Sequence, residues 1–109
     1  MYLTMNRFKV KTGQEAAFEA IWTGRDSHLP QVKGFVAFHL MKGAAHDGYT
    51  LYASHTLWDS RESFEAWTRS EAFRAAHKGA GAHADIYLGP PELELFESVQ
   101  TIAADSAAA

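Results

Sequence analysis

The sequence predicts an α+β fold of the ferredoxin-like, split βαβ type, with a single antiparallel sheet. Residues 2–10 alternate between two sets of side chains, as strands do, and an amphipathic helical stripe follows them. Residues 34–43 and 49–58 alternate in the same way and are separated by a turn rich in Gly and Asp. A second helical region and a last strand complete the order strand, helix, strand, strand, helix, strand.

The first helix is predicted to follow the first strand directly. Thr12 and Glu15 have the spacing of a capping box, which marks a helix start. The helix is expected to end near Gly24. Its apolar side chains lie on one stripe and are expected to face the sheet. They are Ala17, Phe18, Ile21 and Trp22.

The second helical region is predicted to be two short helices. Asp59 is expected to cap the first of them, and Ser70 interrupts the helical run. The predicted helices cover residues 60–69 and 71–78, and Gly79 is expected to end the second in a left-handed conformation.

The remaining segments complete one domain, predicted over residues 1–102. The hairpin between the middle strands is expected to turn over residues 43–48. A last strand is predicted over residues 93–101, and the small, polar tail 103–109 is expected to be disordered.

Composition excludes several classes of function. The net charge is −3 and the ten Lys and Arg residues are scattered, so we expect no nucleic-acid partner. The absence of cysteine excludes disulfides, thiolate metal sites and cysteine nucleophiles. No apolar run approaches the roughly 20 residues of a membrane span, and the N-terminus lacks the features of a signal peptide. A cytoplasmic protein without a membrane partner is therefore expected.

One face of the predicted sheet lacks a layer that would bury its apolar side chains. Its strands alternate apolar residues on both faces, whereas the helices of one chain cover only one face. We therefore expect a homodimer that forms through the sheets.

Two aromatic side chains on the interrupted helical region are candidates for a ligand site. In one unbroken helix, Trp67 and His77 would differ by about 80° in azimuth and by about 15 Å along the axis. A bend at Ser70 would let them line two sides of one cavity, which suits a large, flat ligand. Trp67 is alternatively a core residue, because Phe64 lies on the same stripe.

His77 has two interpretations. It is either a capping or exposed histidine at a helix end, or a metal ligand. One histidine is too few for a zinc site, which uses three or four protein ligands. Haem needs only one axial histidine, because the porphyrin supplies the other nitrogens.

Asn6 and Arg25 are further candidates. Asn6 lies in the middle of a strand, where an unpaired buried amide costs roughly 1–3 kcal/mol. It is therefore bonded either to a neighbouring backbone group or to a ligand oxygen. Arg25 follows the first helix and is either solvated or paired with an anion.

Four segments of the chain carry a family resemblance, and they are MNRFKVKTGQEAAFE, KGFVAFHLMKG, YTLYASHTLWDSRESFEAWTRSEAFRAAH and ELELFESVQ. Over about Tyr2 to Gln100, the chain resembles the antibiotic biosynthesis monooxygenase superfamily of dimeric α/β barrels. Within the superfamily, the combination of Asn6, Trp67 and His77 resembles the IsdG-type haem-degrading monooxygenases.

This resemblance implies that haem is opened oxidatively to a linear tetrapyrrole and that its iron is released. Haem would be both the substrate and the oxygen-activating group, with O2 as co-substrate. The chain has no flavin or nicotinamide fingerprint, so an external electron donor, a reductase or a small reductant, is expected. His77 would be the axial ligand of the iron, Trp67 would press on the macrocycle, and Asn6 would hydrogen-bond to the oxygen species or water on the iron.

The resemblance also implies the residues that line the haem pocket. They are His77, Arg25, Trp22, Phe64 and Phe73, with Arg25 near the entrance.

Two alternatives to haem degradation remain open. One is a cofactor-free quinol-type monooxygenase of the same fold, and the other is a non-enzymatic haem carrier or buffer.

Overall fold

The computed structural model describes residues 1–25, 28–76 and 84–104 and contains one four-stranded antiparallel sheet. The strands lie in the order β2-β3-β1-β4. Their bounds are β1 Tyr2–Lys11, β2 Phe35–His46, β3 Tyr49–Trp58 and β4 Glu92–Glu97. This order, with a helical segment before β2 and another after β3, confirms the predicted α+β, ferredoxin-like class.

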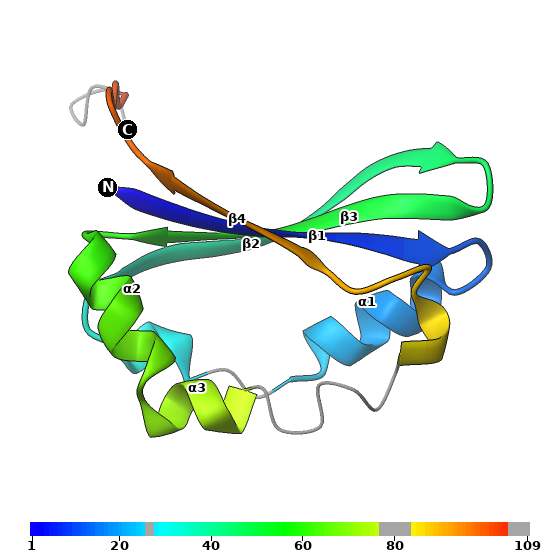
Figure 1. Ribbon diagram of the computed structural model, residues 1–109, viewed down its shortest axis with the longest axis horizontal. Coiled ribbons are helices and arrows are strands. Elements are labelled where there is room, and N and C mark those ends of the chain that lie inside the picture. Colours follow the sequence, from blue (N-terminus) through cyan, green and yellow to red (C-terminus); the bar gives the residue numbers. More distant parts are fainter. Residues whose placement is uncertain (26–27, 77–83, 105–109) are drawn as a thin grey trace.

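All the described helices lie on one face of the sheet (Figure 1). Helix α1 lies below one end of the sheet, and α2 and α3 lie below the other end. The bounds are α1 Glu15–Thr23, α2 Arg61–Thr68 and α3 Glu71–Ala76, with 3-10 turns η1 Leu29–Gln31 and η2 Ala84–Ile86. In the part of the chain that the structure describes, the opposite face, here called the outer face, carries no helix. None of these helices is long and apolar enough to cross a membrane.

The hairpin between β2 and β3 is tighter than predicted. The ladder continues through the pair His46–Tyr49, so only Asp47 and Gly48 form the turn. Gly48 has φ +85°, a conformation that other residues rarely adopt. The prediction of a turn over residues 43–48 is therefore wrong, because Gly43 lies inside β2, next to a register shift between Lys42 and Ala45.

The start of α1 also differs from the prediction. The N-cap residue is Gln14, not Thr12, and its side chain makes no capping hydrogen bond. Gly13, at φ +93°, turns the chain after β1 and moves the helix start downstream. The Glu15 carboxylate accepts a hydrogen bond from the Gly13 amide at 2.8 Å and another from the Thr50 hydroxyl at 2.8 Å. Glu15 therefore ties α1 to β3.

Helix α2 begins one residue later than a cap at Asp59 would require. The Ser60 side chain caps it, accepting a hydrogen bond from the Ser63 amide at 3.1 Å. Asp59 instead joins α2 to the start of β2, because its amide donates to the Gly34 carbonyl at 2.8 Å. A hydrogen bond from the Ser63 hydroxyl holds the pKa of the Asp59 carboxyl below its usual value.

The predicted break at Ser70 is confirmed. The Ser70 hydroxyl donates to the Trp67 carbonyl at 2.6 Å and accepts from the Phe73 amide at 3.1 Å. One side chain thus ends α2 and caps α3. The predicted continuation through His77 to Gly79 lies outside the described residues.

The last strand is shorter than the predicted range 93–101. It ends at Glu97, and the Ser98 hydroxyl then contacts the Gln100 carbonyl at 3.1 Å and the Thr101 hydroxyl at 2.8 Å. These local contacts replace the ladder after Glu97. Of the predicted disordered tail, residues 103 and 104 belong to no helix or strand, and 105–109 lie outside the described residues.

The core lies at both ends of the helix-facing side of the sheet. Beneath α1 it is formed by the α1 cluster, which consists of Phe8, Val10, Phe18, Tyr52 and Ile86. At the other end it is formed by the α2 cluster, in which Trp58 and Tyr2 are buried and contact rings of α2. The α2 cluster consists of Tyr2, Trp58, Phe64 and Trp67.

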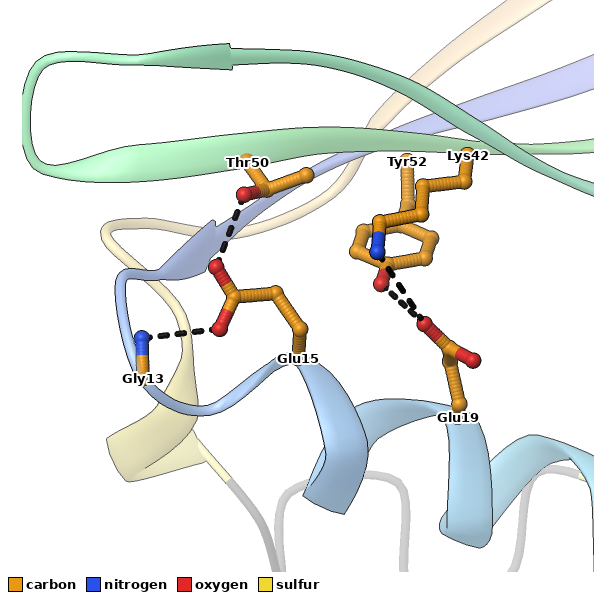
Figure 2. Close-up of polar contacts among 6 residues, drawn as sticks. All are labelled: Gly13, Glu15, Glu19, Lys42, Thr50 and Tyr52. Carbon is orange, nitrogen blue, oxygen red and sulfur yellow. Dashed lines mark hydrogen bonds and ion pairs between the residues drawn. The ribbon is translucent and has the colours of Figure 1, made fainter.

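Helix α1 is braced against the hairpin by polar contacts (Figure 2). The Tyr52 hydroxyl donates a hydrogen bond to Glu19, and the Lys42 ammonium lies 3.8 Å from the same carboxylate. Burial, together with this bond, raises the pKa of Tyr52, so the phenol remains a donor. A pocket of about 540 Å³ lies beside these groups, but its carboxylates are already paired, so the contacts hold the helix in place.

Candidate functional site

A band of short polar side chains separates the two aromatic clusters on the helix-facing side of the sheet. In the β-sheet register, Asn6 lies directly opposite Ser54 on β3 and Leu93 on β4. Asn6 is half-buried and Ser54 is buried. The band consists of Thr4, Asn6, Ser54 and Thr56. It lies in the middle of the sheet, between the α1 cluster and the α2 cluster.

The Asn6 amide makes no side-chain hydrogen bond within residues 1–25, 28–76 and 84–104. An amide at this position has two donors and one acceptor to satisfy. Neighbouring backbone groups of β1 are already committed to the ladders with β3 and β4. The amide is therefore available to a ligand on the helix-facing side.

Beside Asn6, part of the apolar surface of the sheet is uncovered. Leu93 and Leu95 of β4 share the helix-facing side with Asn6 and Thr4, yet they are 57% and 47% exposed. Neighbouring exposed leucines on the face that the helices otherwise cover are typical of a binding surface. We call this pair the β4 floor.

Among the described residues, Trp67 contacts the rings of Trp58, Phe64 and Phe73. Its indole lies 5.3 Å from the Trp58 ring and 6.3 Å from the Phe64 ring, between centroids. Phe73 of α3 meets it edge-on at 4.8 Å, with the planes at 85°. Trp67 is half-buried and thus belongs to the core while presenting part of its surface. The structure therefore brings together Trp67, Phe64 and Phe73, three of the residues singled out from the sequence.

Trp22 and Arg25 form a second group, at the end of α1. The Trp22 ring stacks on Phe38 of β2, with centroids 6.0 Å apart and planes at 12°. The Arg25 guanidinium lies 4.2 Å from the centre of the Trp22 ring, which is a cation–π contact. Arg25 is exposed and has no ion pair within the described ranges. Its remaining donors can therefore meet an anion.

Residues 1–79 match the model of a family described as antibiotic biosynthesis monooxygenase. The chain belongs to this family. The matched range includes Asn6, Trp22, Arg25 and Trp67.

Curated relatives of this chain are named for haem degradation. A "Heme-degrading monooxygenase" of Shouchella clausii is 37% identical over 65 residues, 60% of this chain and 60% of that relative, so this match spans less than two thirds of the relative. A "Heme oxygenase (staphylobilin-producing)" of Staphylococcus haemolyticus is 30% identical over 79 residues, 72% of this chain and 74% of that relative.

A similar solved structure is that of the heme-degrader MhuD from Mycobacterium tuberculosis, with two hemes bound in its active site. The two chains superpose with a TM-score of 0.71 at 28% identity. The alignment covers 94% of this chain and 100% of that chain.

Part of the site was not visible in the sequence. The sequence pattern places Ser54 in a strand, but it does not tell which residue lies opposite. Only the pairing of β1 with β3 puts Ser54 beside Asn6 in the polar band. Phe38 and the β4 floor are likewise defined by long-range pairing and by what the helices leave uncovered. Of the predicted site residues, His77 lies outside the described part of the chain.

Proposed function

We propose that this monooxygenase degrades haem, opening it oxidatively to a linear tetrapyrrole and releasing the iron. O2 is the co-substrate, and electrons come from an external donor. The names of relatives at 37% and 30% identity support the proposal, as does the likeness to a haem-bound structure at 28% identity.

The observation that carries the proposal is the β4 floor beside the Asn6 amide. A flat apolar macrocycle needs an uncovered apolar surface and aromatic walls, together with a polar group aimed at its centre. The β4 floor offers the first, Trp67 the second and Asn6 the third. These side chains support haem as the ligand.

In this proposal, bound haem supplies the iron that activates O2 and is itself the molecule that is oxidised. His77 would hold the iron of bound haem through an imidazole nitrogen. On the helix-facing side of the sheet, the Asn6 side-chain amide donates a hydrogen bond to an oxygen atom of the bound ligand or of water, and this bond orients that oxygen. Bound haem, lying between the β4 floor and Trp67, would shield this hydrogen bond from bulk water.

Trp67 acts in this proposal as a rigid wall. Its indole cannot swing away easily, because Trp58 lies on one side and Phe73 meets it edge-on. A fixed indole can press on a bound macrocycle and bend it. Phe64 and Phe73 support this wall from α2 and α3.

Arg25 and Trp22 are proposed to receive the edge of the macrocycle that carries carboxylates. The Arg25 guanidinium is positioned over the Trp22 ring, which leaves its N–H groups at the rim of the stack for an anion. A charge-assisted bond of this kind is stronger than a neutral one. Trp22 itself adds apolar surface next to Phe38.

We further propose that the protein is a homodimer that forms through the outer face of the sheet. Leu3, Leu57 and Phe96 line a shallow pocket of about 210 Å³ on that face, and Phe96 is 46% exposed. A second copy would bury these apolar side chains.

The direct test is a hemin titration of the purified chain, followed by addition of a reductant under air. We expect a saturable Soret band that decays on reduction, with a linear tetrapyrrole identified by mass spectrometry. His77→Ala should weaken hemin binding and abolish turnover. His46→Ala is the matched control, because His46 lies at the hairpin end stacked on Tyr49, and it should behave as the wild type.

Other outcomes would reassign the function. A protein that stays colourless with hemin would favour a quinol-type monooxygenase, in which the polar band serves proton transfer. A Soret band that persists under reductant and air would favour a haem carrier. Normal ring opening by His77→Ala would overturn the axial assignment.

A further inference from the structure

Two histidines face each other on the outer face of the sheet. His39 of β2 and His55 of β3 are direct partners in the ladder. Their strand neighbours Phe38 and Thr56 belong to the helix-facing side, so the two imidazoles point to the opposite side, away from the proposed haem site.

The separation of the two rings suits a shared metal ion. The ring centroids of His39 and His55 are 5.7 Å apart and the planes are inclined at 58°. A transition metal binds imidazole nitrogen at about 2.0 to 2.1 Å, which puts the ring centre about 3.2 Å from the ion. Two rings on one ion at this separation would subtend roughly 125°, an open tetrahedral angle.

The imidazoles are not otherwise committed. Nδ1 of His55 is buried and has no hydrogen-bond partner within the described residues. Because no hydrogen bond to a described residue fixes Nδ1 of His55, the imidazole ring can rotate about its Cβ–Cγ bond and direct a nitrogen atom towards the ion. In the row of paired residues that crosses the sheet at His55, Met5 of β1 pairs with His55 and Glu94 of β4 pairs with Met5. The Glu94 carboxylate already forms an ion pair with Arg7. No carboxylate or cation of that row therefore competes for the histidine pair.

We propose that His39 and His55 together chelate one divalent transition-metal ion of the zinc, nickel and copper class. Imidazole is a preferred ligand for these ions, whereas Mg²⁺ and Ca²⁺ prefer oxygen. The described residues hold no cluster of three or more potential ligands. The remaining positions on the ion are therefore filled by water or by the same pair of a second copy. This site is separate from the proposed haem function, because it lies on the other face of the sheet.

The test uses the full chain without haem and Ni²⁺ or Zn²⁺ alone as the probe, in isothermal titration calorimetry and equilibrium dialysis. We expect one high-affinity ion per chain or one per two chains. Either stoichiometry supports the proposal, and the second assigns the missing ligands to a second copy. His39→Ala and His55→Ala should each weaken binding by about tenfold or more, because each removes one bond of the chelate.

His46→Ala is the matched control, because it removes a histidine of the same strand that pairs with Tyr49 instead of a second histidine. It should leave the affinity for Ni²⁺ unchanged. If an alanine variant misfolds by circular dichroism, His39→Gln or His55→Gln takes its place. Unchanged Ni²⁺ affinity in folded variants at both positions would overturn the proposal, as would the absence of binding to the wild type.

Hemin titration of the same variants separates this site from the proposed function. His39→Ala and His55→Ala should keep the Soret band and its decay. Loss of Ni²⁺ binding with normal haem degradation supports two independent sites. Failure of Ni²⁺ binding leaves the haem proposal untouched.

Discussion

The Trp67 indole meets the Phe73 ring edge-on across the break between α2 and α3, with centroids 4.8 Å apart. The chain between them is held by one hydroxyl, that of Ser70, which bonds to the Trp67 carbonyl and to the Phe73 amide. The residue that interrupts the helix therefore also sets the contact between the two rings.

Ser70→Ala should lower the free energy of unfolding by about 1 kcal/mol, the usual cost of losing a helix N-cap. Urea unfolding followed by circular dichroism measures it. Ser70→Asp keeps the acceptor for the Phe73 amide and should lose less. Equal stability of the alanine variant and the wild type would contradict a capping role.

Gly34→Ala should destabilise the protein far more than Gly48→Ala. Both glycines have φ +85°, so both variants bear the strain of a left-handed residue, about 1 to 2 kcal/mol. A Cβ at Gly34 would also overlap the Ser63 side chain and lie 2.7 Å from an Asp59 carboxylate oxygen, whereas a Cβ at Gly48 meets nothing within 4 Å.

The difference between the two glycine variants isolates this clash at the junction of β2 and α2. We expect Gly34→Ala to cost about 1 to 3 kcal/mol more than Gly48→Ala, the typical cost of overpacking. Thermal and urea unfolding of both proteins provide the comparison. An equal loss in free energy of unfolding for the two variants would mean that the junction of β2 and α2 accommodates the added Cβ without a clash.

Glu15→Gln should reduce the acid sensitivity of the fold. The Glu15 backbone amide and then the Thr50 hydroxyl hold the pKa of this carboxyl below 4.5, its usual value. Because the folded pKa is lowered, the stabilisation is present above pH 4.5 and is lost as the pH falls through the folded value.

Urea midpoints of the wild type and Glu15→Gln, measured at about pH 6 and about pH 3, test this relation. The wild type should be the more stable protein at the higher pH, and the difference should shrink at the lower pH. A difference that grows on acidification would contradict the sign of the shift. No large effect is expected, because the carboxylate is near solvent.

Asn6→Ala should retain hemin yet lose most of its turnover. Removing one donor that acts at a reacting centre costs about 100-fold to 1,000-fold in rate. Single-turnover decay of the Soret band under air and reductant measures the loss. Normal decay in a variant that binds hemin would exclude Asn6 from the reaction.

Trp67→Ala should flatten the bound macrocycle and slow ring opening, whereas Trp67→Phe should recover part of the rate. Resonance Raman spectra of the hemin complexes report the shape of the macrocycle. The melting temperature of each variant separates this effect from lost packing against Trp58 and Phe73. A bent macrocycle in Trp67→Ala would mean that another group presses on it.

Phe96→Glu should convert the proposed homodimer into a monomer, measured by light scattering after size-exclusion chromatography. Leu95→Glu is the matched control, because it is the next residue of β4, has a similar exposure of 47% against 46%, and lies on the helix-facing side. It should stay dimeric. Equal masses for the two variants would contradict assembly through the outer face.

The sequence by itself determined the order of the elements, the strand alternation and the helix break at Ser70. These features depend on residues close together in the chain, such as the Ser70 hydroxyl and its neighbours three positions away on either side. Local resemblance also identified Asn6 and Trp67 as candidates and the family to which the chain belongs.

The tertiary structure decided which side chains meet. The N-cap residues are Gln14 and Ser60 and not the predicted Thr12 and Asp59. The turn at Gly13 delays the start of α1, and Asp59 is joined to Gly34 across the fold. The register that places Ser54 and Leu93 beside Asn6 joins strands far apart in the chain, so no local pattern encodes it. Only the fold leaves the β4 floor uncovered, because burial depends on how the whole chain packs.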